Sequence, residues 1–263
     1  FRGGWNAISM LSDKDAEKGV CTHSSGNHAQ AVAYSAQKKG IPAYIVMPNN
    51  SPNVKLEAVK GYGANITLCE PTLEARRTTL EEIAEKTGAA IIHPFNNPNV
   101  IAGQGTAALE LIEDIGELDA VIAPIGGGGL MSGTCITTRN LLPKAKLFGA
   151  EPEGADDAYR SLKEGKMLPQ ESPNTICDGL LTSLGENTWN ILKDHLNAIY
   201  TVSDDEVIKA MKLIWERMKI IIEPSCATPV AVVMSPEFRE LKGIKKVGII
   251  LTGGNIDLSK IPF

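Results

Sequence analysis

Residues 22–28 read Thr-His-Ser-Ser-Gly-Asn-His and stand between a short apolar run and the helical pattern of residues 28–37. Such a strand-to-helix turn exposes the backbone N–H groups of the helix start, which carry partial positive charge and attract a carboxylate. Ser24 and Asn27 add side-chain donors, and Ser25 is a candidate for proton transfer. Because Ser and Asn also favour the N-cap position for structural reasons, the turn alone leaves a helix cap and an anion site equally open.

Strand-like and helix-like runs alternate along the chain on both sides of this turn. Short β-rich runs predict strands over residues 43–47, 64–69, 89–92, 119–125, 145–150, 198–202 and 246–251. Helical periodicity between them predicts helices over residues 52–60, 72–86, 102–115, 130–141, 155–164 and 223–233. Ser203-Asp-Asp-Glu206 fits a capping box and predicts one more helix, running to about residue 220. The alternation indicates an α/β fold with parallel sheets covered by helices.

The composition of the chain excludes several classes of protein. The 263 residues, 43% hydrophobic and 22% charged, are typical of a globular protein with one large or two modest domains. A net charge of −5 without a basic cluster argues against nucleic-acid and membrane-surface partners, and no apolar run is long enough to span a membrane. Five scattered cysteines without a Cys-x-x-Cys pair indicate the reduced thiols of a cytoplasmic protein.

Four polar or glycine-rich turns follow predicted strands, at residues 22–28, 126–129, 151–157 and 252–255. Ligands of open α/β sheets bind at the carboxyl ends of the strands, so we expect all four turns to converge on one crevice.

The second of these turns, Gly126-Gly-Gly-Gly129, lies between an apolar strand and a helix and predicts a cradle of backbone N–H groups for a phosphate. It lacks the Gly-Lys-Ser/Thr of a Walker loop, and with Ser132 it fails the third glycine of a dinucleotide loop. Glu151, at the end of the next strand, is placed to hold an adenosine ribose. A nicotinamide-dependent dehydrogenase therefore remains an alternative at this point.

The remaining turns offer oxygen ligands and a hydroxyl. Glu151, Asp157 and a backbone carbonyl between them are hard ligands suited to Mg²⁺ or Ca²⁺, and a solvated acidic loop is the equally open alternative. Thr252 puts a hydroxyl at the tip of the last strand, either to face a heteroaromatic nitrogen or simply to form a tight turn. Tyr62 and Arg76 are weaker candidates, and Arg76 fits a solvated helix face.

Taken together, the motifs resemble the fold-type II pyridoxal-phosphate enzymes, relatives of the tryptophan synthase β-subunit in the serine/threonine dehydratase family. In chain order they are Ser24–Gln30, Gly126–Gly129, Asp178-Gly179, Glu223-Pro224 and Thr252–Asn255. Within this family the chain is most similar to the eukaryotic serine racemases. Threonine dehydratases usually carry Ala where Ser25 stands.

The resemblance implies two open twisted, mainly parallel sheets, with residues 1–18 and 96–263 in a large cofactor-binding domain and 19–95 in a small substrate-side domain. It also implies a Schiff-base lysine immediately before Phe1, since Phe1-Arg2-Gly3 matches the end of the family's lysine segment. That lysine is not in the sequence, so we expect residues upstream of Phe1.

Residue roles also follow from the resemblance. Gly126, Gly127, Gly128 and Gly129 would hold the cofactor phosphate, Asn27 the ring hydroxyl oxygen, and Thr252 the pyridine nitrogen. Ser24, Ser25, Asn27 and His28 would surround the substrate carboxylate, with Arg76 and Asp178 near the rest of the substrate. Glu151, the Ala155 carbonyl and Asp157 would bind the divalent cation. Gln30, Tyr62 and Asn255 would touch an activating nucleotide, ATP, at the interface of a homodimer.

The implied activity is racemisation of serine with accompanying dehydration to pyruvate and ammonia. Ser25 would carry the proton on the face of the substrate opposite the lysine, because two opposed proton carriers invert the α-carbon. Alternatives are a dehydratase for threonine or 3-hydroxyaspartate in the same family, the dehydrogenase above, and a cofactor-free binding protein.

Overall fold

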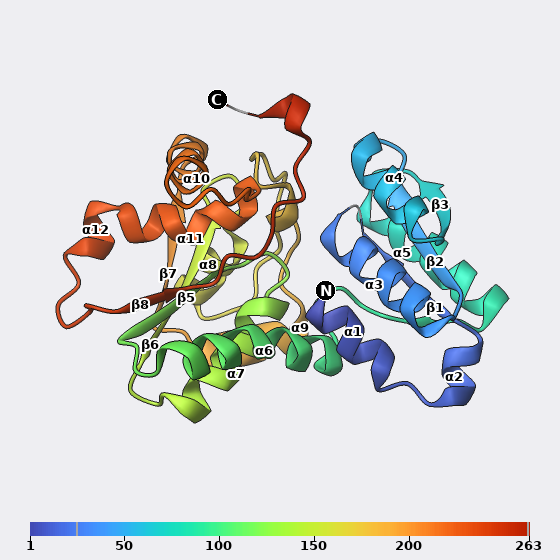
Figure 1. The fold of residues 1–263 in the computed structure, drawn as a ribbon, viewed down its shortest axis with the longest axis horizontal. Coiled ribbons are helices and arrows are strands. Elements are labelled where there is room, and N and C mark those ends of the chain that lie inside the picture. The colour runs from blue at the N-terminus through green and yellow to red at the C-terminus, as the bar shows by residue number, and fades with distance from the viewer. Residues whose placement is uncertain (25, 262) are drawn as a thin grey trace. The chain divides into compact units, whose positions relative to one another are not determined.

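The computed structural model describes residues 1–24, 26–261 and 263, which separate into two compact units, Phe1–Gly103 and Gln104–Phe263 (Figure 1). Each unit holds one four-stranded sheet in which every strand pair is parallel. The helix α6 (Pro98–Ile115) begins in the first unit and ends in the second. The predicted fold class, parallel sheets covered by helices, is confirmed.

The first unit has the strand order β3-β2-β1-β4. Its strands are β1 (Val20–His23), β2 (Ala43–Pro48), β3 (Asn65–Cys69) and β4 (Ala90–Ile91). Its helices are α1 (Arg2–Ser9), α2 (Asp13–Glu17), α3 (Asn27–Lys39), α4 (Asn53–Gly61) and α5 (Leu73–Thr87). Apolar residues of α1, α3 and α4 form the larger core with the sheet, and α5 closes a second core that contains Cys21 and Leu80. The sheet is therefore covered on both faces.

The second unit has the strand order β7-β6-β5-β8. Its strands are β5 (Ala120–Pro124), β6 (Lys146–Pro152), β7 (Ala198–Val202) and β8 (Val247–Ile249). Its helices are α7 (Gly129–Leu141), α8 (Asp157–Glu164), α9 (Glu186–His195), α10 (Asp204–Met218), α11 (Pro224–Met234) and α12 (Pro236–Arg239), with 3₁₀ turns η1 (Asp178–Leu180) and η2 (Leu258–Lys260). Figure 1 shows α10 and α11 on one side of this sheet and α6, α7 and α9 on the other, and a separate core lies on each side.

Local sequence accounts for several of the helix ends. Ser203 accepts a hydrogen bond from the Glu206 N–H while the Glu206 carboxylate accepts from the Ser203 N–H, so the predicted capping box is confirmed. The helix α6 begins four residues before the predicted position 102, because the Asn97 side chain accepts hydrogen bonds from two N–H groups of its first turn. The helix α9 was not predicted, and its N-cap is Gly185 rather than a residue with a capping side chain.

The helix α11 contains a proline in its interior and is nevertheless continuous. Pro229 has no N–H to donate to the Ser225 carbonyl one turn earlier. The Thr228 hydroxyl donates to that carbonyl instead, at 3.0 Å, and both residues are buried. The missing backbone hydrogen bond is thus replaced within the helix.

The units of the structure differ from the predicted domains at residues 1–18 and 96–103, which group with the first unit. Ala7 and Ile8 of α1 pack in that unit's larger core. The cofactor-binding and substrate-side roles assigned to the domains stay predictions. Among the described residues, no helix combines the length and apolar character needed to cross a bilayer.

Candidate active site

In the first unit, the turn at residues 22–28 is fixed to the end of β4. The Thr22 hydroxyl donates to the Ile92 carbonyl at 2.7 Å, and His28 Nε2 lies 3.0 Å from the same oxygen. Gly26 is the N-cap of α3, and no side chain makes a capping hydrogen bond there. The cap interpretation of this turn is therefore not supported for its described residues. Ser25, the predicted proton carrier, lies outside the described residues.

The histidines of this turn are neutral. Burial lowers the pKa of His28 to about 4, so its ring carries one proton near pH 7. With Nε2–H donating to the Ile92 carbonyl, Nδ1 is left as an acceptor. His93 follows β4, and burial lowers its pKa to about 4 as well, while its Nδ1 accepts from the N–H groups of Phe95 and Asn96. These rings supply hydrogen-bonding positions without charge.

Arg76 on α5 is not a simple solvated residue. Its Nε atom is buried and has no hydrogen-bond partner within the protein. Burial lowers the pKa of the guanidinium. Burial also lowers the pKa of His23 at the end of β1, and the charge of Arg76 adds to that effect. A cation with an unused buried donor is suited to bind an anionic group.

In the second unit, the glycine turn between β5 and α7 is buried and closely surrounded. A Cβ on Gly126 would lie 3.0 Å from the Leu180 Cα atom. Gly128 has a φ of 85°, and a Cβ there would lie 2.9 Å from side-chain atoms of both Leu184 and Thr188. The buried turn of backbone N–H groups at a helix start therefore requires glycine and fits a phosphate.

Asp178, predicted near the substrate, begins the turn η1 and is exposed. This turn packs against Gly126, and the N–H of Gly179 donates to the Ser225 hydroxyl at 3.0 Å. The first turn of α11 therefore supports η1, and η1 supports the glycine turn.

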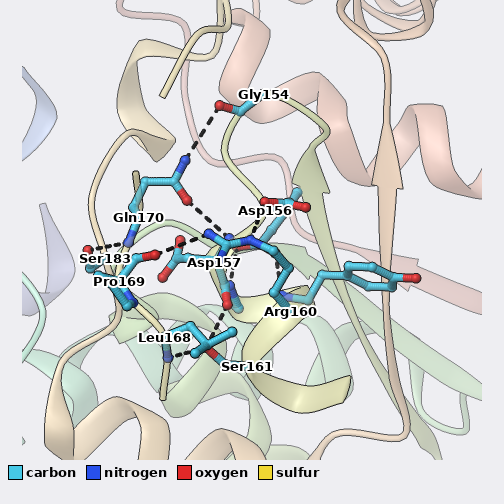
Figure 2. Close-up of polar contacts among 12 residues, drawn as sticks. Gly154, Asp156, Asp157, Arg160, Ser161, Leu168, Pro169, Gln170 and Ser183 are labelled. Carbon is cyan, nitrogen blue, oxygen red and sulfur yellow. Dashed lines mark hydrogen bonds and ion pairs between the residues drawn. The ribbon is translucent and has the colours of Figure 1, made fainter. Parts of the chain in front are cut away.

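Glu151 in β6 and Asp157 at the start of α8 are both fully buried, so the solvated-loop alternative does not hold for these two side chains. The Glu151 carboxylate accepts from the N–H groups of Ala158 and Tyr159 at 3.2 and 2.7 Å, and Asp157 Oδ2 accepts from the Leu184 N–H at 3.0 Å. Figure 2 shows how Gln170 and Ser183 complete the polar contacts around Asp157. Most of the polar groups of this turn make hydrogen bonds, and these bonds fix the positions of the two carboxylates.

Burial also gives the two carboxylates unusual proton affinities. It raises the pKa of Asp157 to about 6, and burial together with the charge of Asp157 raises the pKa of Glu151 well above its ordinary value. Asp157 Oδ1 is buried without a hydrogen-bond partner. Two buried carboxylates that repel each other, one of them with an oxygen that has no hydrogen-bond partner, fit a hard divalent cation. In the described part of the chain, no three acidic, His or Cys side chains gather, so a cation here would need backbone or water oxygens as well.

Thr252, just beyond the described end of β8, is exposed, and its N–H donates to the Cys226 thiol at 3.0 Å. Two of the predicted nucleotide contacts carry buried amide nitrogens without partners, Gln30 Nε2 in the first unit and Asn255 Nδ2 in the second. Tyr62 packs its ring 5.1 Å from that of Tyr34. The predicted convergence of the turns of both units on one crevice stays a prediction.

Sequence reasoning missed four residues beside these turns: Lys55, His93, Thr188 and Cys226. Lys55 is 6% exposed, and its Nζ lies 3.5 Å from the position that a Cβ on Gly26 would take. Its only signal in the sequence is the spacing of four from Val59, which puts both on one face of α4. The other three are defined by contacts with distant segments and have no local signal.

Comparison with known proteins agrees with this arrangement. The family model for pyridoxal-phosphate dependent enzymes matches residues 1–253. The chain belongs to this family. A serine racemase of Dictyostelium discoideum is 53% identical over 99% of this chain and 81% of its own length. A beta-hydroxyaspartate dehydratase of Paracoccus denitrificans is 49% identical over 100% of this chain and 82% of its own length.

The fold is also similar to that of solved structures. The structure of maize serine racemase superposes with a TM-score of 0.96 at 44% identity, covering 98% of this chain and 79% of that one. The protein is therefore a pyridoxal-phosphate dependent enzyme with the fold of the serine racemases, and the expected cofactor is confirmed at the level of the family. The comparisons give no support to the nicotinamide-dependent dehydrogenase.

Proposed function

We propose that this protein interconverts L-serine and D-serine and, as a second outcome, dehydrates serine to pyruvate and ammonia. The observation that carries the proposal is the 53% identity to a serine racemase over 99% of the chain. The bound cofactor would supply electron withdrawal that makes the α-proton of an attached amino acid acidic. The residues of the two units then bind the substrate and direct its proton.

The turn of the first unit would receive the substrate carboxylate. Ser24, Asn27 and the N–H groups at the start of α3 would donate to it, and neutral His28 would hold the turn through the Ile92 carbonyl. Ser25 would carry a proton to or from the α-carbon on the face opposite the lysine that we place immediately before Phe1. A serine hydroxyl is a weak base at neutral pH, so this step needs nearby donors to stabilise the charge.

The second unit would hold the cofactor. Gly126, Gly127, Gly128 and Gly129 would bind its phosphate, Thr252 would face its ring nitrogen, and Asn27 of the first unit its ring hydroxyl. A neutral hydroxyl at the ring nitrogen does not favour its protonation as a carboxylate partner would, so the ring itself would withdraw electrons less strongly. Asp178 would lie at the substrate end of the site, next to the turn η1 that packs against Gly126.

Glu151, the Ala155 carbonyl and Asp157 would hold Mg²⁺ or Ca²⁺. The proposal is supported by the buried Asp157 Oδ1, which has no partner in the protein, and by the repulsion between two buried carboxylates. A cation there would compensate both charges.

We further propose a cytoplasmic homodimer that ATP activates through Gln30, Tyr62 and Asn255. The partnerless buried amides of Gln30 and Asn255 are donors suited to a polar ligand. The five cysteines are all free and buried, as in a protein that works in a reducing compartment.

The test is product analysis with the full-length protein and L-serine. D-Serine, separated by chiral chromatography, and pyruvate, measured by reduction, are both expected. Ser25→Ala should lose racemisation and keep part of the elimination activity. Equal loss of both activities would contradict the role of Ser25, and absence of D-serine from the parent reaction would contradict the racemase.

A dehydratase for 3-hydroxyaspartate is the second candidate, supported by Arg76 and by the 49% identity to the Paracoccus enzyme. The guanidinium would bind the second carboxylate, which serine lacks. Arg76→Gln should then weaken kcat/KM for 3-hydroxyaspartate by about 100-fold and leave that for serine within about threefold. An equal effect on both substrates would exclude this specificity.

A further inference from the structure

Thr188, the third residue of α9, binds the carbonyl of the glycine turn. Its Oγ1 lies 2.8 Å from the Gly127 oxygen and 2.9 Å from the Gly185 oxygen, and it accepts the Gly185 N–H at 2.9 Å. The hydroxyl has one hydrogen, and the Gly185 oxygen already accepts the Trp189 N–H at 2.8 Å. The Gly127 oxygen is the nearer of the two acceptors of the hydroxyl, and the fully buried side chain cannot exchange this bond for one with water.

The same short segment also contacts the carboxylate pair. The N–H of Leu184 donates to Asp157 Oδ2 at 3.0 Å, and the Leu184 side chain packs against Gly128 together with that of Thr188. Residues 184–188 thus have one end bound to Asp157 and the other to the glycine turn. We call residues 184–188 the connector.

Through these contacts two ligands can restrict the motion of the connector, one at each end. A cation on the second oxygen of Asp157 fixes that side chain, and with it the Leu184 N–H. A phosphate on the glycine turn fixes Gly127 and Gly128, and with them Thr188. Because each ligand orders groups that the other would otherwise have to order, their binding free energies are linked.

We propose that Thr188 is a positioning residue for the phosphate-binding turn, and that through the connector the divalent cation and the cofactor phosphate strengthen each other's binding. The inference rests on the proposed cation site at Asp157 and on the family's cofactor, and it does not depend on which amino acid is the substrate.

The test measures linkage with the full-length protein. The dissociation constant of pyridoxal 5′-phosphate is determined by fluorescence titration of the apo form, in EDTA and in saturating magnesium chloride. The ³¹P resonance of the bound cofactor is recorded in both conditions. We expect magnesium to tighten cofactor binding by about fivefold or more and to shift the resonance. By reciprocity, the cofactor should tighten magnesium binding by the same factor.

Three variants locate the effect. Thr188→Val removes the hydroxyl at nearly constant volume and should reduce the linkage to less than about twofold, whereas Thr188→Ser should restore it. Thr134→Val is the matched control, because Thr134 is equally buried, lies on α7 after the glycine turn, and has no partner for its hydroxyl. It should keep the full linkage.

The outcomes separate the proposals. Full linkage in Thr188→Val, or none in the parent protein, overturns the inference even if D-serine is produced. Linkage that is lost in Thr188→Val and retained in Thr134→Val supports it even if the substrate is not serine. Magnesium binding that Asp157→Asn leaves unchanged would overturn both the cation site and the connector.

Discussion

The two units bury opposite kinds of ionisable group beside their polar turns. The first buries imidazoles, with the pKa of His28 and His93 lowered to about 4, and the second buries carboxylates, with that of Asp157 raised to about 6. The main cause is the same loss of hydration, which favours the neutral form in each case. A neutral imidazole is the ordinary state near pH 7, so the buried histidines of the first unit need no counter-ion. A buried carboxylate near pH 7 either carries an uncompensated charge or holds a proton, and this is the basis for the cation that we propose in the second unit.

The largest expected effect is an opposite pH dependence of the two units in EDTA. Between pH 6.5 and 4 the unfolded chain binds protons at His28 and His93 that the folded first unit does not, so this unit loses stability as the pH falls. Folded Asp157 keeps its proton between pH 4 and 6 where the unfolded chain releases it, so the second unit loses stability as the pH rises. Over this pH range each histidine lowers the free energy of unfolding of the first unit by up to about 3 kcal/mol, and partial exposure of the rings makes the effect smaller.

Hydrogen exchange read by mass spectrometry, corrected for intrinsic exchange rates, can follow both units in one experiment. Peptides from β1 and α3 should become less protected at pH 5 than at pH 7, and peptides from β6 and α8 more protected. A common slope in both units would contradict the comparison.

The next effect concerns the charge of Asp157. Asp157→Asn removes one of two repelling buried carboxylates and should stabilise the cation-free protein at pH 7.5 by about 2–3 kcal/mol, a gain of several degrees in Tm. It should also abolish the rise in Tm that we expect magnesium or calcium chloride to give the parent protein. Calorimetry in EDTA and in excess cation measures both. A stabilisation by cation that survives the substitution would place the ion elsewhere.

A smaller effect separates hydrogen bonding from titration in the first unit. His28→Gln keeps a donor for the Ile92 carbonyl but cannot titrate, so it should reduce the loss of stability between pH 6.5 and 4. Thr22→Val removes the other donor to that carbonyl and should cost about 1 kcal/mol at every pH. Denaturant unfolding at pH 5 and pH 7 compares the variants, and a pH-dependent effect of Thr22→Val would contradict this separation.

The smallest effect is expected one residue from Asp157. Asp156 forms a part-exposed ion pair with Arg160 at 2.8 Å, with side chains 30% and 34% exposed. Asp156→Asn should change stability by less than about 1 kcal/mol, and less still in 0.5 M salt, because water and ions screen the pair. An effect as large as that of Asp157→Asn would show that sequence position, not burial, determines the response.

The sequence was sufficient for features that depend on neighbours along the chain. The alternation of strands and helices, the capping box at Ser203 and the glycine turn at 126–129 are such features, and the structure agrees with each. Gly128 needs its positive φ for local reasons, which makes a glycine run informative.

Features that depend on distant segments were not predictable in the same way. The complete burial of Glu151 requires α8 to supply two N–H groups, and an acidic turn in the sequence fits a solvated loop as well. The role of Thr188 depends on its hydrogen bond to Gly127, which is 61 positions away in the chain, so no local pattern indicates it. Residues 1–18 group with the first unit because Ala7 and Ile8 of α1 pack in its larger core. No local sequence pattern specifies that packing.

The replacement of a backbone hydrogen bond in α11 has a consequence for how this sequence can change over generations. Loss of Thr228 while Pro229 remains would leave the buried Ser225 carbonyl unpaired, at a cost of about 1–3 kcal/mol. Loss of Pro229 first restores an N–H for that carbonyl and makes the hydroxyl dispensable. The order of substitutions therefore matters. Replacing Pro229 first and Thr228 second avoids a destabilised protein, whereas replacing Thr228 first passes through one.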